Sequence, residues 1–287
     1  VTGHKGYIGN HLFQTLKGLG HEVMGIDLNE EYPKDILEVL QENKDKSGFH
    51  PHYQNFNPEY IFHLACFPRI EYSMENPIET MRNNVLATSY VLNFARKVGA
   101  KRVIYSSSSS VVGNGSGPEN PYALQKLASE MEVGLYAKLY GLDTVSLRYF
   151  NVYSPDQKPD GPYSTAICAW MDAIRKEKRP FITGTGEQRR DMLHVKDAVS
   201  ANIFAMNCEQ NLNGMHYDVG TGENISLNEI RQIVKEYQPS VNFDYVAPRP
   251  NDVYETKADI SGLETLGWTA KVDMLSGIRE CFSGVLK

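Results

Sequence analysis

Short apolar runs alternate with helical patterns over the first 150 residues of this 287-residue chain. The runs at 60–65, 102–105 and 145–150 have the length and the β-branched and aromatic content of buried strands. Residues 77–99 and 122–140 read as helices that are apolar on more than one face. This alternation predicts an α/β fold in which a parallel sheet is covered by helices on both faces. Ligands of such sheets bind at the carboxyl ends of the strands.

A glycine-rich stretch, VTGHKGYIG, opens the chain and is followed by a helical pattern. Gly3, Gly6 and Gly9 have the spacing that lets a tight turn bring backbone close to a pyrophosphate, with a helix N-terminus facing the anion. The next predicted strand, 22–26, ends at Asp27, 18 residues after Gly9. A carboxylate about 20 residues after the glycines suits an adenosine ribose and repels a 2′-phosphate, so the pattern favours NAD over NADP. We also expect residues before Val1, including most of a first strand.

The stretch SSSSSVVGNGSGPENPYALQK, at 106–126, begins where the run at 102–105 ends. Pro121 is suited to start a helix, which places Tyr122 and Lys126 on one face at i and i+4. A neighbouring ammonium lowers the pKa of a phenol from about 10, so this Tyr is a candidate base toward a sugar hydroxyl. With 17 tyrosines and 17 lysines, chance alone gives about one such pair, so the assignment depends on the surrounding motifs.

The amino-acid composition narrows the classes of function that this chain can have. A hydrophobic content of 41% and a charged content of 22% are typical of a soluble globular protein with one or two domains. The net charge of −6 argues against a general nucleic-acid binder. We find no signal peptide and no apolar stretch near the roughly 18 residues that span a membrane. Four dispersed cysteines without ligand spacing predict reduced thiols, a cytoplasmic protein and no metal site.

Beyond residue 151 the pattern changes to loops rich in Pro, Asp and Gly, with helical segments at 164–176 and 226–237. Arginines in these loops, Arg190 and Arg249, are suited to clamp a diphosphate. We therefore predict one domain at 1–153 and a second at 154–287, with parts of about 190–220 returning to the main sheet.

Taken together, these residues resemble the extended short-chain dehydrogenase/reductases, in particular the nucleotide-sugar epimerase/dehydratase family. The resemblance covers essentially the whole chain and implies a Rossmann-type doubly wound parallel sheet that binds NAD, with a smaller mixed α/β domain that binds the nucleotide sugar. The motifs that carry it, in family order, are TGxxGxxG at 2–9, HLA at 63–65, NNV at 83–85, SSSSSVVG at 106–113, YxxxK at 122–126, RYFNVY at 148–153, GTGEQRRDMLHV at 184–195 and RPND at 249–252.

The resemblance implies a role for each matched position. The implied catalytic residues are Ser108, the base Tyr122 and Lys126. The implied NAD contacts are Gly3, Gly6, Gly9, Asp27, Asp35, Ile36, Asn84, Tyr122, Lys126 and Tyr149. The implied substrate contacts are Ser108, Asn151, Arg190, Arg249 and Asp252.

Departures from the family pattern indicate which of the family's reactions to expect. Val112 stands where the family often has Tyr, and Asp156 stands where related epimerases often have Arg. The 4,6-dehydratases carry Asp-Glu directly after the catalytic hydroxyl, whereas this chain has Ser109 and Ser110, which disfavours dehydration. The resemblance thus implies NAD-dependent 4-epimerisation of a UDP-hexose through a 4-keto sugar. A UDP-hexuronate 4-epimerase, another NAD-dependent nucleotide-sugar decarboxylase or reductase, and a catalytically silent NAD-binding regulator remain alternatives.

Two further expectations concern the sugar and the assembly. In similar epimerases the position four residues after the RPGD-type aspartate lines the pocket near C2, and here it is Thr256. A small residue there admits N-acetyl groups, so we predict interconversion of UDP-GlcNAc and UDP-GalNAc as well as UDP-Glc and UDP-Gal. The two apolar helices at 77–99 and 122–140 predict a homodimer.

Overall fold

The computed structural model describes residues 1–29, 35–40, 56–159, 165–248 and 253–284. The chain divides into two compact units, which we describe separately. Unit 1 comprises Val1–Val111, Pro118–Arg148 and Val199–Tyr217, and unit 2 comprises Val112–Gly117, Tyr149–Ala198 and Asp218–Lys287. The boundary between residues 153 and 154 stays a prediction. In the described ranges no helix has the length and hydrophobicity needed to cross a membrane.

A sheet with the strand order β1-β2-β3-β6 forms the centre of unit 1. Its strands are β1 (Tyr60–His63), β2 (Arg102–Ser108), β3 (Asp143–Tyr149) and β6 (Met215–Val219). Strands β1 and β2 pair in parallel. Thr2 forms parallel bridges to His63 of β1 and to Ile26, so the predicted strand at 22–26 joins the sheet through Ile26.

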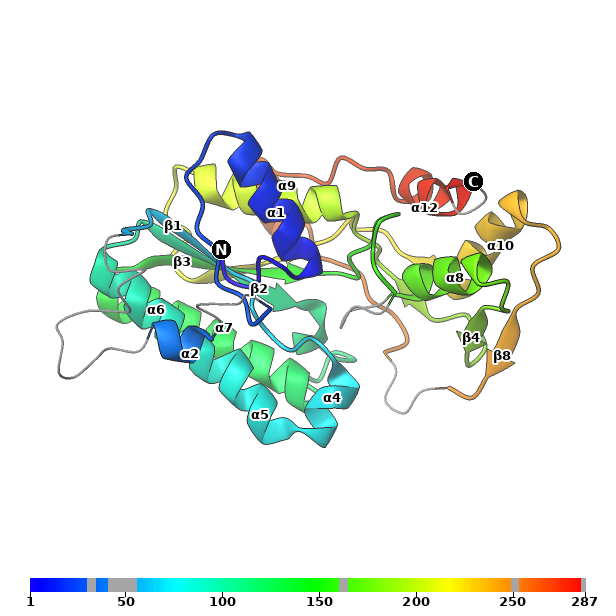
Figure 1. Cartoon of the computed structure of the whole chain (residues 1–287), viewed down its shortest axis with the longest axis horizontal. Helices are drawn as coiled ribbons and strands as arrows, with labels where there is room; N and C mark the ends of the chain where they lie inside the picture. Colours follow the sequence, from blue (N-terminus) through cyan, green and yellow to red (C-terminus); the bar gives the residue numbers. More distant parts are fainter. Residues whose placement is uncertain (30–34, 41–55, 160–164, 249–252, 285–287) are drawn as a thin grey trace. The chain divides into compact units, whose positions relative to one another are not determined.

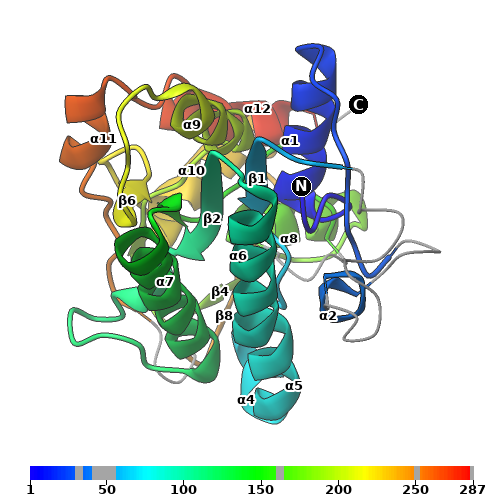
Figure 2. The ribbon, with the colours of Figure 1, turned by 90° about the vertical axis from the view of Figure 1, so that its left-hand side faces the viewer.

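Helices cover both faces of this sheet. Figures 1 and 2 show α6 and α7 on one side and α1 and α9 on the other, which confirms the predicted α/β fold. The helices are α1 (Tyr7–Gly18), α2 (Ile36–Val39), α4 (Ile70–Glu75), α5 (Pro77–Met81), the π-helical turn η1 (Arg82–Leu86), α6 (Ala87–Val98), α7 (Pro121–Tyr140) and α9 (Val195–Asn207).

The helix predicted at 77–99 forms as α5, η1 and α6 in succession. The core side of α6 follows the helical period, and its Val91, Leu92 and Ala95 are completely buried. Helix α7 begins as predicted, with Pro121 in its first turn and the Asn120 side chain accepting from the Ala123 N–H at 2.9 Å.

A buried arginine joins three parts of unit 1. The guanidinium of Arg102, in β2, lies 2.6 Å from the carboxylate of Asp143 in β3. It also donates to the carbonyls of Ala205, Cys208 and Gln210, so α9 and the turn after it are fixed to the same strand. A buried pair of this kind costs little only when its donors are largely satisfied, and four of the five guanidinium N–H groups have an acceptor here.

Unit 2 has its own core. Its helices are α8 (Ala166–Arg175), α10 (Leu227–Tyr237), α11 (Ser261–Leu266) and α12 (Met274–Ser283). Its strands are β4 (Phe181–Thr183), which pairs in parallel with β8 (Asp244–Val246), and β5 (Arg189–Arg190), which pairs antiparallel with β7 (Ile225–Ser226). The core contains Ile167 and Met171 of α8, Ile230 of α10 and Ile278 of α12. A capping box of Ser226 and Glu229 begins α10.

Candidate active site

The glycine-rich loop is shaped by contacts that exclude side chains. Gly3 has a φ of 72°, and a Cβ there would lie 2.7 Å from the Ala65 nitrogen. A Cβ at Gly9 would lie 2.0 Å from the Gly3 carbonyl oxygen. Helix α1 follows at once, and its N-cap, Gly6, has no side chain to occupy the first N–H groups. The loop therefore presents backbone donors and a helix N-terminus, as a dinucleotide pyrophosphate requires.

Asp27 is fixed to this loop. Its carboxylate accepts from the Lys5 N–H at 2.8 Å and from the Asn29 N–H at 2.9 Å. Each carboxylate oxygen keeps a lone pair for a ribose hydroxyl. The loop and this carboxylate together fit the adenosine half of NAD. Asp35, the implied adenine contact, caps α2 by accepting from the Leu37 N–H at 2.8 Å, and Ile36 is buried in the core.

Asn84 is almost completely buried and hydrogen-bonded within the protein. Its carbonyl accepts from the Phe67 N–H at 2.7 Å, and its amide donates to the Phe67 carbonyl at 3.2 Å and to Gln125 Oε1 at 2.8 Å. Asn84 thus holds the segment that follows β1. Its implied contact with the cofactor stays a prediction. Gln125, which the sequence analysis did not single out, joins this network from α7.

Lys126 lies in the interior, with 2% of its surface exposed. Its ammonium donates to the Ser106 carbonyl at 2.6 Å and lies 4.9 Å from the centre of the Tyr105 ring and 6.0 Å from that of Tyr122. Burial by itself lowers the pKa of Lys126, but the negative charge that Cys66, Tyr105 and Tyr122 can carry outweighs it and raises the pKa. Lys126 therefore stays an ammonium beside the Tyr122 phenol.

A second network fixes β2 to α7. The Ser107 hydroxyl donates to Glu130 Oε1 at 2.5 Å, and Arg148 of β3 binds the same carboxylate through two bonds of 2.8 and 2.7 Å. Helix α7 also packs against β2 and against the 3₁₀ turn η2 (Ser109–Val111). Ser108 ends β2, so the serine, tyrosine and lysine predicted to be catalytic lie on two elements in contact. Glu130 was missed, although it follows Lys126 by the same four-residue spacing that separates Lys126 from Tyr122.

His63 acts as a neutral, packed strand residue. Its Nδ1 lies 2.7 Å from Thr2 Oγ1 and its Nε2 lies 3.0 Å from Thr88 Oγ1. Thr88 donates its proton to the Asn84 carbonyl, so Nε2 carries the hydrogen and Nδ1 accepts from Thr2. Burial, followed by the charge of Lys126, lowers the pKa of His63 to about 3.

This lowered pKa predicts a loss of stability in mild acid. The folded chain keeps His63 neutral down to about pH 3, whereas the unfolded chain protonates it below about pH 6.5. Protons therefore favour the unfolded state, and stability decreases as the pH falls from 6.5 toward 3. We expect His63 to lower the free energy of unfolding by about 2 kcal/mol between pH 7 and 5. Urea unfolding at both pH values should show a smaller decrease for His63→Gln, and an equal decrease would contradict the assignment.

Four of the described residues that we predict to contact substrate or cofactor, Tyr149, Asn151, Arg190 and Thr256, lie in unit 2. Asn151 has a φ of 27°, and its amide donates to the Asp191 carbonyl at 2.8 Å and to the Thr256 hydroxyl at 3.2 Å. Arg190 donates to the Arg189 carbonyl at 2.8 Å. Tyr149, at the end of β3, is buried. Asn151, Thr256 and the backbone on either side of Arg190 are thus brought together. Arg249 and Asp252 lie outside the described residues.

Asp191, which the sequence analysis did not single out, organises this part of unit 2. Its carboxylate is completely buried and accepts from the Thr221 hydroxyl and from the N–H groups of Thr221, Gly222 and Ala258, at 2.8–3.1 Å. Burial raises the pKa of Asp191, and these bonds oppose the rise. Asp191 thereby joins the segment at 220–222 to the segment that carries Thr256.

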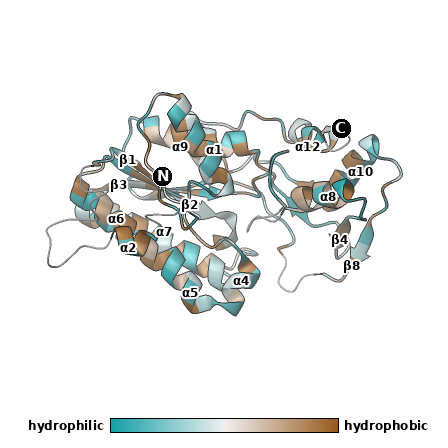
Figure 3. Cartoon of the chain, viewed as in Figure 1, coloured by the Kyte–Doolittle hydropathy of each residue, from teal (hydrophilic) through white to brown (hydrophobic). Residues whose placement is uncertain are grey.

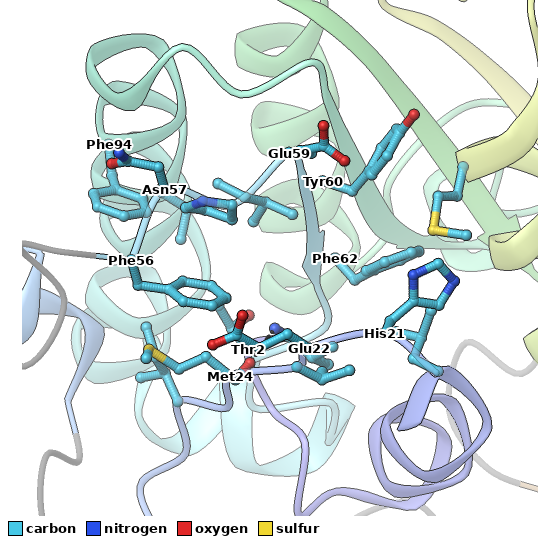
Figure 4. A pocket seen from close by; sticks show the side chains of 18 of the residues that line it. Thr2, His21, Glu22, Met24, Phe56, Asn57, Glu59, Tyr60, Phe62 and Phe94 are labelled. Atoms are coloured by element: carbon cyan, nitrogen blue, oxygen red, sulfur yellow. Dashed lines mark hydrogen bonds between the residues drawn. The ribbon is translucent and has the colours of Figure 1, made fainter. Parts of the chain in front are cut away.

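A cavity of 310 Å³ in unit 1 lies away from the predicted catalytic residues. Met24, Phe56 and Phe62 surround it (Figure 4), together with Leu16, Val91 and Phe94. Neither Ser108, Tyr122 nor Lys126 lines it. Its lining is mainly apolar and includes core side chains of α1, β1 and α6.

Comparison with known proteins agrees with this geometry. The model of the NAD dependent epimerase/dehydratase family matches residues 1–220. A putative UDP-glucose 4-epimerase from Methanocaldococcus jannaschii is 31% identical over 97% of this chain and 95% of its own length. The crystal structure of a UDP-glucose 4-epimerase from Thermotoga maritima with UDP-glucose superposes with a TM-score of 0.89 at 26% identity, covering 100% of this chain and 98% of that one. A UDP-glucuronic acid 4-epimerase from Bacillus cereus, crystallised with UDP-glucuronic acid and NAD, superposes with a TM-score of 0.82 at 26% identity over 99% and 98% of the two chains. The predicted resemblance is confirmed, and the chain belongs to the NAD dependent epimerase/dehydratase family.

Proposed function

We propose that the protein is a UDP-hexose 4-epimerase that acts through a transient 4-keto sugar, with UDP-GlcNAc and UDP-Glc and their C4 epimers as substrates. The observation that carries the proposal is the buried Lys126 ammonium fixed 6.0 Å from the centre of the Tyr122 ring. The relatives that act on UDP-sugars support the nucleotide. Four free thiols and the NAD requirement of the family support a cytoplasmic location.

Each catalytic residue has a role in this reaction. The attraction between Lys126 and Tyr122 favours the phenolate, which accepts the proton of the sugar O4. The Ser108 hydroxyl holds O4 from the side of β2. NAD, when bound beside the glycine-rich loop, supplies a reversible acceptor for the C4 hydride. Ser109 and Ser110 supply no carboxylic acid for elimination of water, so the 4-keto sugar is reduced again on either face.

A panel of nucleotide sugars tests the proposal. We expect NMR to show C4 epimers from UDP-Glc and UDP-GlcNAc, and none from the GDP- and dTDP-sugars. Epimerisation of UDP-glucuronate alone would replace the proposal with the uronate alternative, for which the Bacillus cereus structure is the precedent. Absence of any epimer would reject it.

Thr256→Tyr tests the proposed N-acetyl specificity. The Thr256 hydroxyl accepts from Asn151 Nδ2 at 3.2 Å, so both side chains belong to one polar group. A tyrosine adds bulk and is expected to abolish turnover of UDP-GlcNAc while UDP-Gal is still converted, because size exclusion acts on the larger sugar only. If the wild type converts UDP-Gal but not UDP-GalNAc, the proposal for Thr256 is wrong.

Helix α7 supports a homodimer, because it buries several polar side chains and exposes a row of apolar ones. Gln125, Lys126 and Glu130 are buried, whereas Met131 is 69% exposed. Other exposed apolar side chains on α7 and the neighbouring α5–η1 segment are Leu124, Leu135, Leu139, Ile78, Met81 and Leu86. Figure 3 shows hydrophobic residues among hydrophilic ones along these helices. An exposed apolar surface of this kind favours association with a second copy.

Charged substitutions on this surface should dissociate the dimer. We expect light scattering to give the dimer mass for the wild type and the monomer mass for Met131→Arg/Leu135→Arg, because two buried unpaired charges are costly at an interface. Leu19→Arg is the matched control, since Leu19 is 59% exposed at the end of α1. A monomeric wild type at micromolar concentration would reject the homodimer.

A further inference from the structure

Two serine hydroxyls meet at the carboxyl end of β2. Ser108 Oγ accepts a hydrogen bond from the Ser110 hydroxyl at 2.9 Å and another from the Ser110 N–H at 3.2 Å. Ser110 lies in the 3₁₀ turn η2, which is anchored by the buried side chain of Val111. Both serines belong to unit 1 and are half-buried.

These two bonds determine what the Ser108 hydroxyl can still do. A backbone N–H only donates, and a serine oxygen has two lone pairs and one proton. With both lone pairs occupied by Ser110, Ser108 is left with its own proton as its remaining hydrogen-bonding group. Within the described ranges no residue accepts that proton.

We propose that Ser110 is a positioning residue that turns the Ser108 hydroxyl into a donor toward the substrate oxygen. The inference rests on the proposed epimerase function, in which Ser108 holds O4 while Tyr122 accepts its proton. A donor suits O4, because O4 gains negative charge as it loses its proton and becomes a carbonyl oxygen as the hydride leaves C4. Without the Ser110 hydroxyl, one lone pair of Ser108 Oγ is left unoccupied, so the Ser108 proton can take other orientations and points at O4 only part of the time.

Kinetics of matched variants test this role. Ser110→Ala removes one of the two bonds, so we expect kcat to fall by about 2- to 10-fold with KM and bound NAD unchanged. Ser110→Thr keeps the oxygen and should restore kcat. Ser109→Ala is the control, because no hydrogen bond of the Ser109 hydroxyl is found among the described residues. The double variant Ser108→Ala/Ser110→Ala should be no slower than Ser108→Ala, since Ser110 acts through Ser108.

Several outcomes would overturn the proposal: full activity of Ser110→Ala, failure of Ser110→Thr to restore kcat, or additive losses in the double variant. A crystal structure of the NAD-bound protein gives a readout that needs no turnover. Neutron diffraction from the crystals locates the proton: we expect one hydroxyl rotamer of Ser108 in the wild type and more than one in Ser110→Ala, and an unchanged single hydroxyl rotamer would reject the positioning role. If the wild type converts no UDP-sugar, the proposed function fails, and the rotamers still decide whether Ser110 orients Ser108.

Discussion

Replacing Tyr122 with phenylalanine is expected to reduce kcat by roughly 10²- to 10⁴-fold, because the variant keeps the ring and loses the phenol oxygen that we propose as the acceptor of the O4 proton. The fold should survive. Asn120 and Pro121 still begin α7, and the Tyr122 N–H still donates to the Ser73 hydroxyl at 3.1 Å. NMR time courses with a UDP-sugar measure kcat, and release of the dinucleotide by denaturation measures bound NAD, which should equal that of the wild type.

Tyr105→Phe is a matched control for this experiment. Tyr105 also lies against Lys126, with its ring centre 4.9 Å from the ammonium, but only 1% of its surface is exposed, against 7% for Tyr122. A substrate therefore cannot reach the Tyr105 oxygen. We expect Tyr105→Phe to change kcat far less than Tyr122→Phe. Near-normal turnover by Tyr122→Phe, or an equal loss in both variants, would show that Tyr122 is not the base.

Local signals predicted much of unit 1. The β-branched runs at 102–105 and 145–150 are short and apolar, and both form strands of the central sheet. Pro121 marked the start of α7, because a proline fits the first turn of a helix and a following tyrosine and lysine then share one face. The glycine spacing was equally informative, since the close approach between Gly3 and Gly9 leaves no room for a side chain.

The polar networks could not be predicted from local pattern. Gln125 meets Asn84 across 41 residues of sequence, and Glu130 meets Ser107 across 23. Periodicity finds apolar faces, whereas α7 buries polar residues and exposes Met131 and its apolar neighbours, so the pattern gave no indication of which side faces the core. In unit 2, β4 and β8 have only three residues each. This is too few to show the alternation of apolar and polar residues that predicts a strand.

The second large effect is expected on NAD binding when Gly9 is replaced by alanine. An alanine there would place its Cβ 2.0 Å from the Gly3 oxygen and 2.8 Å from the Gly3 carbonyl carbon, closer than any real contact allows. Both neighbours are backbone, so the first turn of α1 must move away from the loop. Overpacking of this kind costs about 1–3 kcal/mol, and the loop also loses the shape that presents its N–H groups. We expect Gly9→Ala to bind NAD at least about 10- to 100-fold more weakly, and activity to fall with it.

Gly18→Ala separates this steric effect from a general effect of alanine in α1. Gly18 ends the same helix, and a Cβ there would meet nothing within 4 Å. Alanine in a helix is about 0.5–1 kcal/mol better than glycine, so this variant should melt at the same or a higher temperature and keep its NAD. NAD titration by fluorescence measures both affinities. If Gly9→Ala binds NAD as tightly as Gly18→Ala, the close approach of Gly3 and Gly9 does not form the cofactor site, and the assignment of this loop to the pyrophosphate is wrong.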